Sequence, residues 1–192
     1  MIWRRVLRAV LGDRAGVVAI EFAIALPVLC MMVFGVYEIA QAVICYYKLI
    51  DAASSIADLV GQTTVAAGGV GNNDFDNLYT AGEMIMSPNT GSGLQLNIAS
   101  ATFNSSGTGT AIAWQIERGG ASRVPNATLK SSVSTLGVAS GSVIIVKGTY
   151  SFTSALNYFI TTPITMSFQA YAIPRNVAKI SCPPSGSSET CS

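Results

Sequence analysis

An apolar segment near the N-terminus constrains this chain more than any other feature. Residues 17–47 contain only two charged side chains, Glu21 and Glu38. As a helix rising about 1.5 Å per residue, residues 17–36 would be about 30 Å long, which is the thickness of a bilayer's hydrocarbon core. We therefore expect one membrane-spanning helix over about residues 17–37.

The flanks of this segment predict its orientation. Residues 1–16 carry one acidic residue, Asp13, and four arginines: Arg4, Arg5, Arg8 and Arg14. Because positive charge keeps the adjoining end of a span in the cytoplasm, we expect a single-pass protein of the bacterial inner membrane, with its C-terminal part in the periplasm. No small-residue cleavage site of the ordinary secretory type ends the apolar run, so we expect the segment to be retained.

The composition argues against several classes of function. The chain has no histidine, which removes the Ser-His-Asp and Cys-His nucleophile systems and histidine-ligated metals. Its formal net charge of +1 provides no basic field for nucleic acid. The acids that remain as catalytic candidates are dispersed: Asp74, Asp76, Glu83 and Glu117. We expect no enzyme activity, no cofactor, no metal site and no nucleic-acid partner.

The four cysteines form two pairs of different character. Cys30 and Cys45 lie within the apolar helix, where a free cysteine acts as a small hydrophobic residue. Cys182 and Cys191 lie in a tail, residues 181–192, rich in Pro, Ser and Gly. In an oxidising compartment we expect these two to form a disulfide.

Periodicity predicts the rest of the fold. Apolar residues recur at helical spacing to about residue 60, so we expect one long helix over 17–60, then a Gly-rich linker over 61–73. A second helix should begin at Asp74 and stop before Pro88. Alternating residues predict a hairpin over 94–98 and 112–116 and two further strands over 143–152 and 164–172, with a weaker helical signal within 119–142. We expect an α+β domain over 74–180 with a small antiparallel sheet.

The residues around Glu21 resemble a known family. Gly16, four apolar residues and then Glu21-Phe22 resemble the class III leader site of type IV pilins, especially those of the Flp or tight-adherence branch. The wider run AIEFAIALP, which ends at Pro27, and the later Gly35-Val36-Tyr37-Glu38 resemble the TadE-like minor pilins, or pseudopilins, of that system. The closing Ile173-Pro174-Arg175 resembles the end of TadE-like domains.

This resemblance implies a function in pilus assembly on a pilin-like fold. A membrane prepilin peptidase would remove residues 1–16 as a leader by cutting after Gly16, which makes Val17 the first mature residue. The carboxylate of Glu21 would then pair with the new Val17 ammonium of a neighbouring subunit and fix its axial register. The implied partners are major and minor pilins and the tight-adherence secretion machinery, and the implied role is initiation or capping of a pilus, with possible incorporation in it.

Several alternatives stay open at this level. The positions of Glu21 and Glu38 are both consistent with carboxylates at the membrane boundary, in contact with solvent or headgroups. The position of Glu38 is also consistent with a contact to a partner protein. Because Pro27 has no backbone N–H to donate, we expect the helix to bend or loosen near residues 23–27. Pro27 itself is either a common proline of a membrane helix or a dedicated hinge. The apolar cluster within 156–160 is either core cover or a subunit contact. The alternative function is a membrane-anchored periplasmic binding module unrelated to pili.

Overall fold

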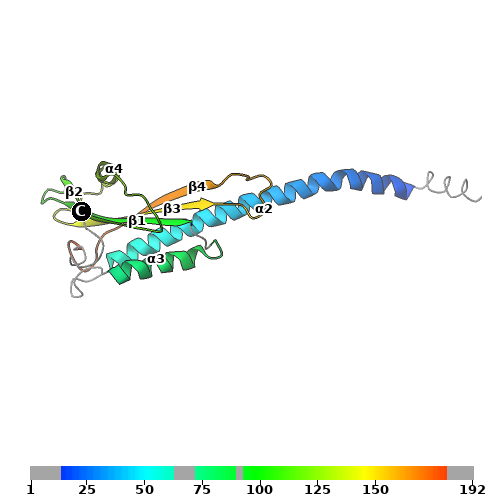
Figure 1. The fold of residues 1–192 in the computed structure, drawn as a ribbon. Helices are drawn as coiled ribbons and strands as arrows, with labels where there is room; N and C mark the ends of the chain where they lie inside the picture. Colours follow the sequence, from blue (N-terminus) through cyan, green and yellow to red (C-terminus); the bar gives the residue numbers. More distant parts are fainter. Residues whose placement is uncertain (1–13, 63–71, 90–92, 181–192) are drawn as a thin grey trace, which may run out of the picture.

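The computed structural model describes residues 14–62, 72–89 and 93–180. A long helix, α2 (Arg14–Gly61), is followed by a second helix, α3 (Asn72–Met86), and then by an antiparallel sheet (Figure 1). The predicted α+β class, with a long N-terminal apolar helix, a second helix and a small antiparallel sheet, is confirmed. The first part of the expected leader, most of the expected linker and the Cys182–Cys191 tail lie outside the described residues.

The sheet has four strands in the order β2-β1-β3-β4. Their bounds are β1 (Leu94–Phe103), β2 (Thr110–Arg118), β3 (Ser142–Phe152) and β4 (Ile164–Ala172). Every neighbouring pair is antiparallel, and Ile98 lies opposite both Ile116 of β2 and Val146 of β3. Since side chains alternate between the faces of a strand, this register gathers the apolar residues of three strands on one face.

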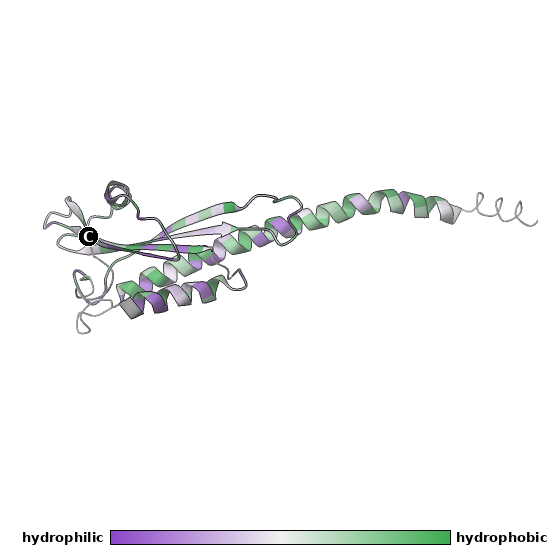
Figure 2. Cartoon of the chain, viewed as in Figure 1, coloured by the Kyte–Doolittle hydropathy of each residue, from purple (hydrophilic) through white to green (hydrophobic). Residues whose placement is uncertain are grey.

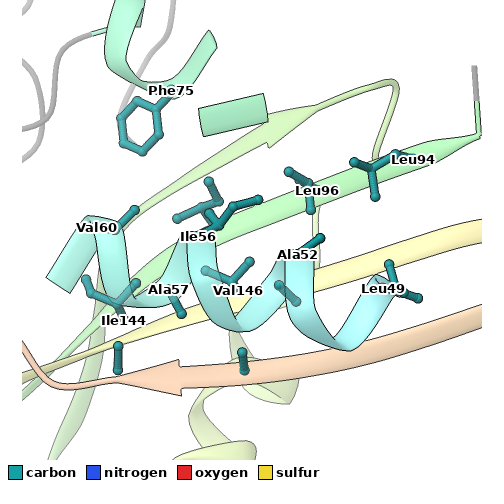
Figure 3. Close-up of a cluster of buried hydrophobic side chains, with 14 of the residues drawn as sticks. Leu49, Ala52, Ile56, Ala57, Val60, Phe75, Leu94, Leu96, Ile144 and Val146 are labelled. Carbon is teal, nitrogen blue, oxygen red and sulfur yellow. The ribbon is translucent and has the colours of Figure 1, made fainter. Parts of the chain in front are cut away.

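The second half of α2 packs on that apolar face. The helix contributes fully buried side chains, among them Leu49, Ala53 and Ile56. The core around them includes Ala52, Ala57 and Val60 of the helix and Leu94, Leu96, Ile144 and Val146 of the strands (Figure 3). Alanines on this side of the helix let its backbone approach the strands closely. At Gly148 of β3 a Cβ would lie 3.0 Å from Leu49 Cδ1, so this position has little room for a side chain.

Helix α3 lies beside α2 and closes one edge of the core (Figure 1). Phe75 packs edge-on against Trp114, with their ring centroids 5.7 Å apart, and Gly82 lets the helix approach Ile56. The helix begins at Asn72, two residues earlier than expected. Asp74 therefore lies in the first turn of α3 and does not cap it, a position where its charge still favours the helix dipole.

The opposite face of the sheet carries a smaller apolar cluster. A short helix, α4 (Asn126–Ser132), provides buried Leu129, and Val133 follows it; both pack near Ala101 and Val143. The weak helical signal within 119–142 is thereby confirmed. Leu136, which shares that spacing, is 41% exposed because the helix has ended before it.

The first half of α2 extends away from the sheet and is apolar along its length (Figure 2). Among the described residues it is the one helix long and apolar enough to cross a membrane, consistent with single-pass anchoring. The helix continues through Pro27 without a break, and its N-terminal part curves gently (Figure 1). The bending or loosening expected near residues 23–27, where proline removes a backbone donor, thus amounts to gentle curvature and not to a break.

We predict that Ile56→Ala will lower the free energy of unfolding by about 2–5 kcal/mol, because it removes a fully buried side chain where α2 meets the sheet. Denaturant unfolding of the full chain in detergent micelles measures this change. The matched variant Leu59→Ala, on the same helix but at a side chain 47% exposed, should cost about 0.5 kcal/mol or less. Equal losses in the two variants would contradict this packing.

Candidate functional site

The residues of the expected processing site lie at the exposed N-terminal part of α2. Gly16, Val17 and Glu21 belong to α2, and all three are exposed in the single chain. Val17 and Glu21 are four residues apart and share one face of the helix. Among the described side chains Glu21 has no hydrogen-bond or ion-pair partner, so its carboxylate is accessible to another molecule.

The other residues of the family motif lie further along α2. Phe22 is 61% exposed, and Pro27 lines a groove between α2 and the loop that joins β3 to β4. Gly35 lies under the ring of Phe159 from that loop, and a Cβ at residue 35 would lie 3.2 Å from Phe159 Cε2. Gly35 therefore lets the β3–β4 loop, residues 153–163, approach the helix.

Glu38 is fully buried and bound within the chain. Its Oε1 accepts a hydrogen bond from the backbone N–H of Tyr158 at 2.8 Å. Its Oε2 accepts two more, from Phe159 at 2.9 Å and from Ile160 at 2.8 Å. The interpretation of Glu38 as a solvated boundary carboxylate is therefore wrong, because the β3–β4 loop covers this side chain and supplies its donors.

Three successive N–H groups that converge on one carboxylate form an anion site made of backbone. Burial of a carboxylate is costly unless hydrogen bonds replace its water, and here the loop provides them. Reciprocally, the loop needs Glu38, since its own N–H groups would otherwise lack partners. Glu38 thus fixes the β3–β4 loop to α2 immediately after the expected span.

The pKa of Glu38 reflects two opposed effects. Burial of the carboxyl raises its pKa, whereas hydrogen bonds from the backbone of Tyr158, Ile160 and Phe159, and from the Ser154 hydroxyl, lower it. Together the hydrogen bonds prevail, and the pKa lies below its ordinary value of 4.5. The charged form is therefore the one that the loop binds.

The C-terminal end of α2 is held by the expected Pro-Arg element. The backbone N–H of Arg175 donates to the carbonyl of Gly61 at 2.9 Å, and its guanidinium Nη2 lies 3.2 Å from Asp58 Oδ1. Asn176 Nδ2 donates to the carbonyl of Gln62 at 2.7 Å. These donors satisfy carbonyls that a helix end leaves unpaired, and the Arg charge suits the negative end of the dipole.

The four dispersed acids do not form a common site. Asp74, Asp76 and Glu83 lie on α3, and Glu117 lies on β2. Asp76 pairs with Arg118 at 2.8 Å, and Glu117 lies 4.0 Å from Arg123, so both have structural partners. Within residues 14–62, 72–89 and 93–180 no group of three or more His, Cys, Asp or Glu side chains is arranged to hold a metal ion.

A polar hollow on the α4 face of the sheet was not expected from the sequence. Its volume is about 210 Å³, and its polar lining comes from Gln95, Asn97, Ser122, Lys147 and Thr149. Asn97 is 3% exposed, and neither end of its amide has a hydrogen-bond partner in the chain. Alternation places the four strand residues Gln95, Asn97, Lys147 and Thr149 on the face opposite α2. No spacing in the sequence indicated that the 119–125 connection, which includes Ser122, would cover them.

We predict that acidification will weaken the contact between Glu38 and the loop. Because the folded pKa is lowered, the stability that this carboxylate contributes is present above the ordinary pKa of 4.5 and is lost as the pH falls through the lower folded value. Thermal unfolding of the full chain in detergent, followed from pH 7 downwards, measures this loss. In Glu38→Gln the contribution should be absent at pH 7, and the acid-dependent loss should shrink; an unchanged pH profile would contradict the assignment.

Comparison with known proteins supports the resemblance expected from the sequence. The family model described as TadE-like protein matches residues 16–58, a segment that begins at Gly16 and includes Glu21, Pro27 and Glu38. Neither the curated proteins nor the solved structures give a match. The expected resemblance to TadE-like proteins is thus confirmed over residues 16–58, which is consistent with a pilus-associated protein of the tight-adherence system.

Proposed function

We propose that this chain is a minor pilin, or pseudopilin, that takes part in the initiation or capping of a tight-adherence pilus. The observation that carries this proposal is the match to TadE-like proteins over residues 16–58. The exposed apolar half of α2 supports it, since such a surface can pack against the N-terminal helices of other pilins. The chain acts as a structural subunit and as a substrate of the peptidase.

Processing takes place at the junction of the leader and the membrane helix. The prepilin peptidase hydrolyses the peptide bond between Gly16 and Val17, which releases residues 1–16 and leaves an ammonium on Val17. The exposure of both residues on α2 supports access by a membrane enzyme. The orientation that fits has the N-terminus in the cytoplasm and the C-terminal domain in the periplasm.

Glu21 then selects the neighbouring subunit. A carboxylate in hydrocarbon is costly, and the ammonium of Val17 on an adjacent chain offsets that cost only when the two helices are in register. Its exposure, and its lack of a partner among the described side chains, support this role. The pair therefore favours one axial offset between subunits.

The proposed organisation follows from these roles. Residues 1–16 are the leader, 17–60 the long helix, 61–73 the linker, 74–180 the periplasmic domain and 181–192 a tail closed by a Cys182–Cys191 disulfide. The described part adds that the second half of α2 is also one layer of the domain core. The domain therefore depends on α2 for its stability as well as for its anchor.

A second candidate function is a membrane-anchored binding module. The polar hollow of about 210 Å³ favours it, because buried Asn97 presents an unpaired amide there and Lys147 adds a positive charge. Mass spectrometry of the N-terminus in the native host separates the two functions. Only the pilin function requires a mature chain that begins at Val17.

We predict that Gly16→Phe will leave the full-length precursor in the membrane, because a bulky side chain at the cleavage site blocks the peptidase. Immunoblotting and N-terminal mass spectrometry detect the retained leader. As a control, Ala25→Leu adds bulk deeper in the same apolar helix and should be shortened normally. Normal shortening of Gly16→Phe would refute the proposed processing site.

We predict that Glu21→Gln will be processed normally but will impair piliation, because the side chain keeps its size and loses the charge that pairs with the ammonium. Electron microscopy and sheared-pilus yields measure piliation, with leader removal checked in the same cells. Glu21→Asp, which keeps the charge, should retain more pili than Glu21→Gln. Wild-type piliation in Glu21→Gln would reject the pairing role.

A further inference from the structure

The β3–β4 loop carries an unusual apolar surface beside the membrane helix. We propose that this loop inserts into the membrane leaflet next to the C-terminal domain, where lipid acyl chains cover Leu156, Tyr158 and Phe159. The inference uses α2 as a membrane anchor but does not depend on leader processing or on pilus assembly. It makes the loop a second point of contact between the domain and the bilayer.

The loop lies along the part of α2 that is expected to span the membrane. The loop packs beside the first half of the helix and forms with it a groove of about 370 Å³, lined by Pro27, Cys30, Met31, Phe34, Leu156 and Tyr158. The helical residues of this lining all lie within the expected span. At about 1.5 Å per residue, the distance from Glu38 back to Pro27 is about 16 Å, roughly half the hydrocarbon thickness.

The loop has no charged residues and exposes large apolar and aromatic side chains. Residues 153–163 contain no Asp, Glu, Lys or Arg. The side chains of Leu156, Tyr158 and Phe159 are 46%, 56% and 53% exposed, although they are among the most apolar of the loop. This surface is continuous with the exposed apolar surface of α2, because Phe159 packs on Gly35.

The charge pattern of α2 places the headgroup layer at about residues 38–48, just beyond the part of the helix that forms the groove with the loop. After Glu38, which the loop covers, the next charged residue is Lys48. Tyr46 and Tyr47 precede it, are exposed, and suit the membrane–water interface. Residues 17–47 would measure about 46 Å as a helix, close to the 40–45 Å of a bilayer with its headgroups.

Backbone N–H groups of the loop find hydrogen-bond partners within the chain. Irregular backbone at membrane depth needs internal partners, because lipid offers none. Glu38 accepts from the N–H groups of residues 158–160, and Ser154 Oγ accepts from the N–H of Asn157 at 3.4 Å. With the oxygen and nitrogen of its side-chain amide exchanged, the orientation that satisfies both, Asn157 donates to the carbonyls of Ile160 at 3.1 Å and Thr161 at 3.3 Å. These bonds satisfy polar groups of the loop within the chain, while the side chains of Leu156, Tyr158 and Phe159 face outward.

A contact with another pilin would also cover an exposed apolar patch. Lipid is the favoured occupant because the patch continues the surface of the membrane helix and lies at the height of its span. A protein contact requires a partner to be present, whereas lipid covers the loop of an isolated chain. That difference decides the experiment.

The test is site-directed spin labelling of the full chain in vesicles of phosphatidylethanolamine and phosphatidylglycerol. The native cysteines are replaced by alanine, and single labels are introduced by Leu156→Cys and, as a second loop site, Tyr158→Cys. Leu136→Cys is the matched control, since Leu136 is 41% exposed but follows α4. Ile24→Cys, at a side chain 71% exposed on α2, reports whether the anchor itself lies in the bilayer.

Collision with oxygen, which concentrates in lipid, and with a water-soluble nickel chelate gives the depth of each label. We expect labels at residues 156, 158 and 24 to favour oxygen and the label at residue 136 to favour the nickel chelate. If residue 24 is in lipid while 156 and 158 behave like 136, the loop proposal is overturned. If the loop labels are shielded from both reagents and the shielding grows with protein-to-lipid ratio, a protein contact replaces it. Circular dichroism confirms that each labelled variant is folded.

Discussion

The contact between Glu38 and three N–H groups of the β3–β4 loop sets the geometry of the described chain. It joins the sheet to α2 at a fixed height, and Arg175 joins it again where the helix ends. Between these two points, the helix is a layer of the core, with residues such as Ile56 fully buried. One helix therefore serves both as membrane segment and as structural centre of the domain, so axial displacement of α2 would displace the sheet.

The sequence predicted the elements better than it predicted their contacts. Helical spacing through Ile56 and strand alternation at Trp114 follow from local burial on one face, and both led to the correct elements. The interpretation of Glu38 failed because its partners, residues 158–160, are about 120 residues away in the sequence. Backbone donors leave no trace in residue type. The absence of charge in the loop was the available signal, and by itself it suits a core, a membrane or a subunit contact.

The small residues of α2 show the same division between local and distant causes. Ala53 recurs at helical spacing, so its place on the sheet follows from periodicity. Gly35 was recognised only through a family resemblance, and its physical reason is the ring of Phe159 above it. The polar hollow around Asn97 could not be predicted either, because the connection that covers it has irregular structure. Periodicity reveals the faces of elements but not which loops return to them.

The two glutamates of the apolar segment meet the same physical requirement in different ways. A carboxylate at or near membrane depth needs donors or a counter-charge. Glu38 finds its donors within the chain and is fully enclosed, so it requires nothing from another molecule. Glu21 is exposed, and the described side chains offer it no partner. Within the described part of the segment, the demand for an external partner is thus concentrated at Glu21, next to the position where leader removal would create an ammonium. This asymmetry is the physical reason why Glu21, rather than Glu38, is the better candidate for control of subunit register.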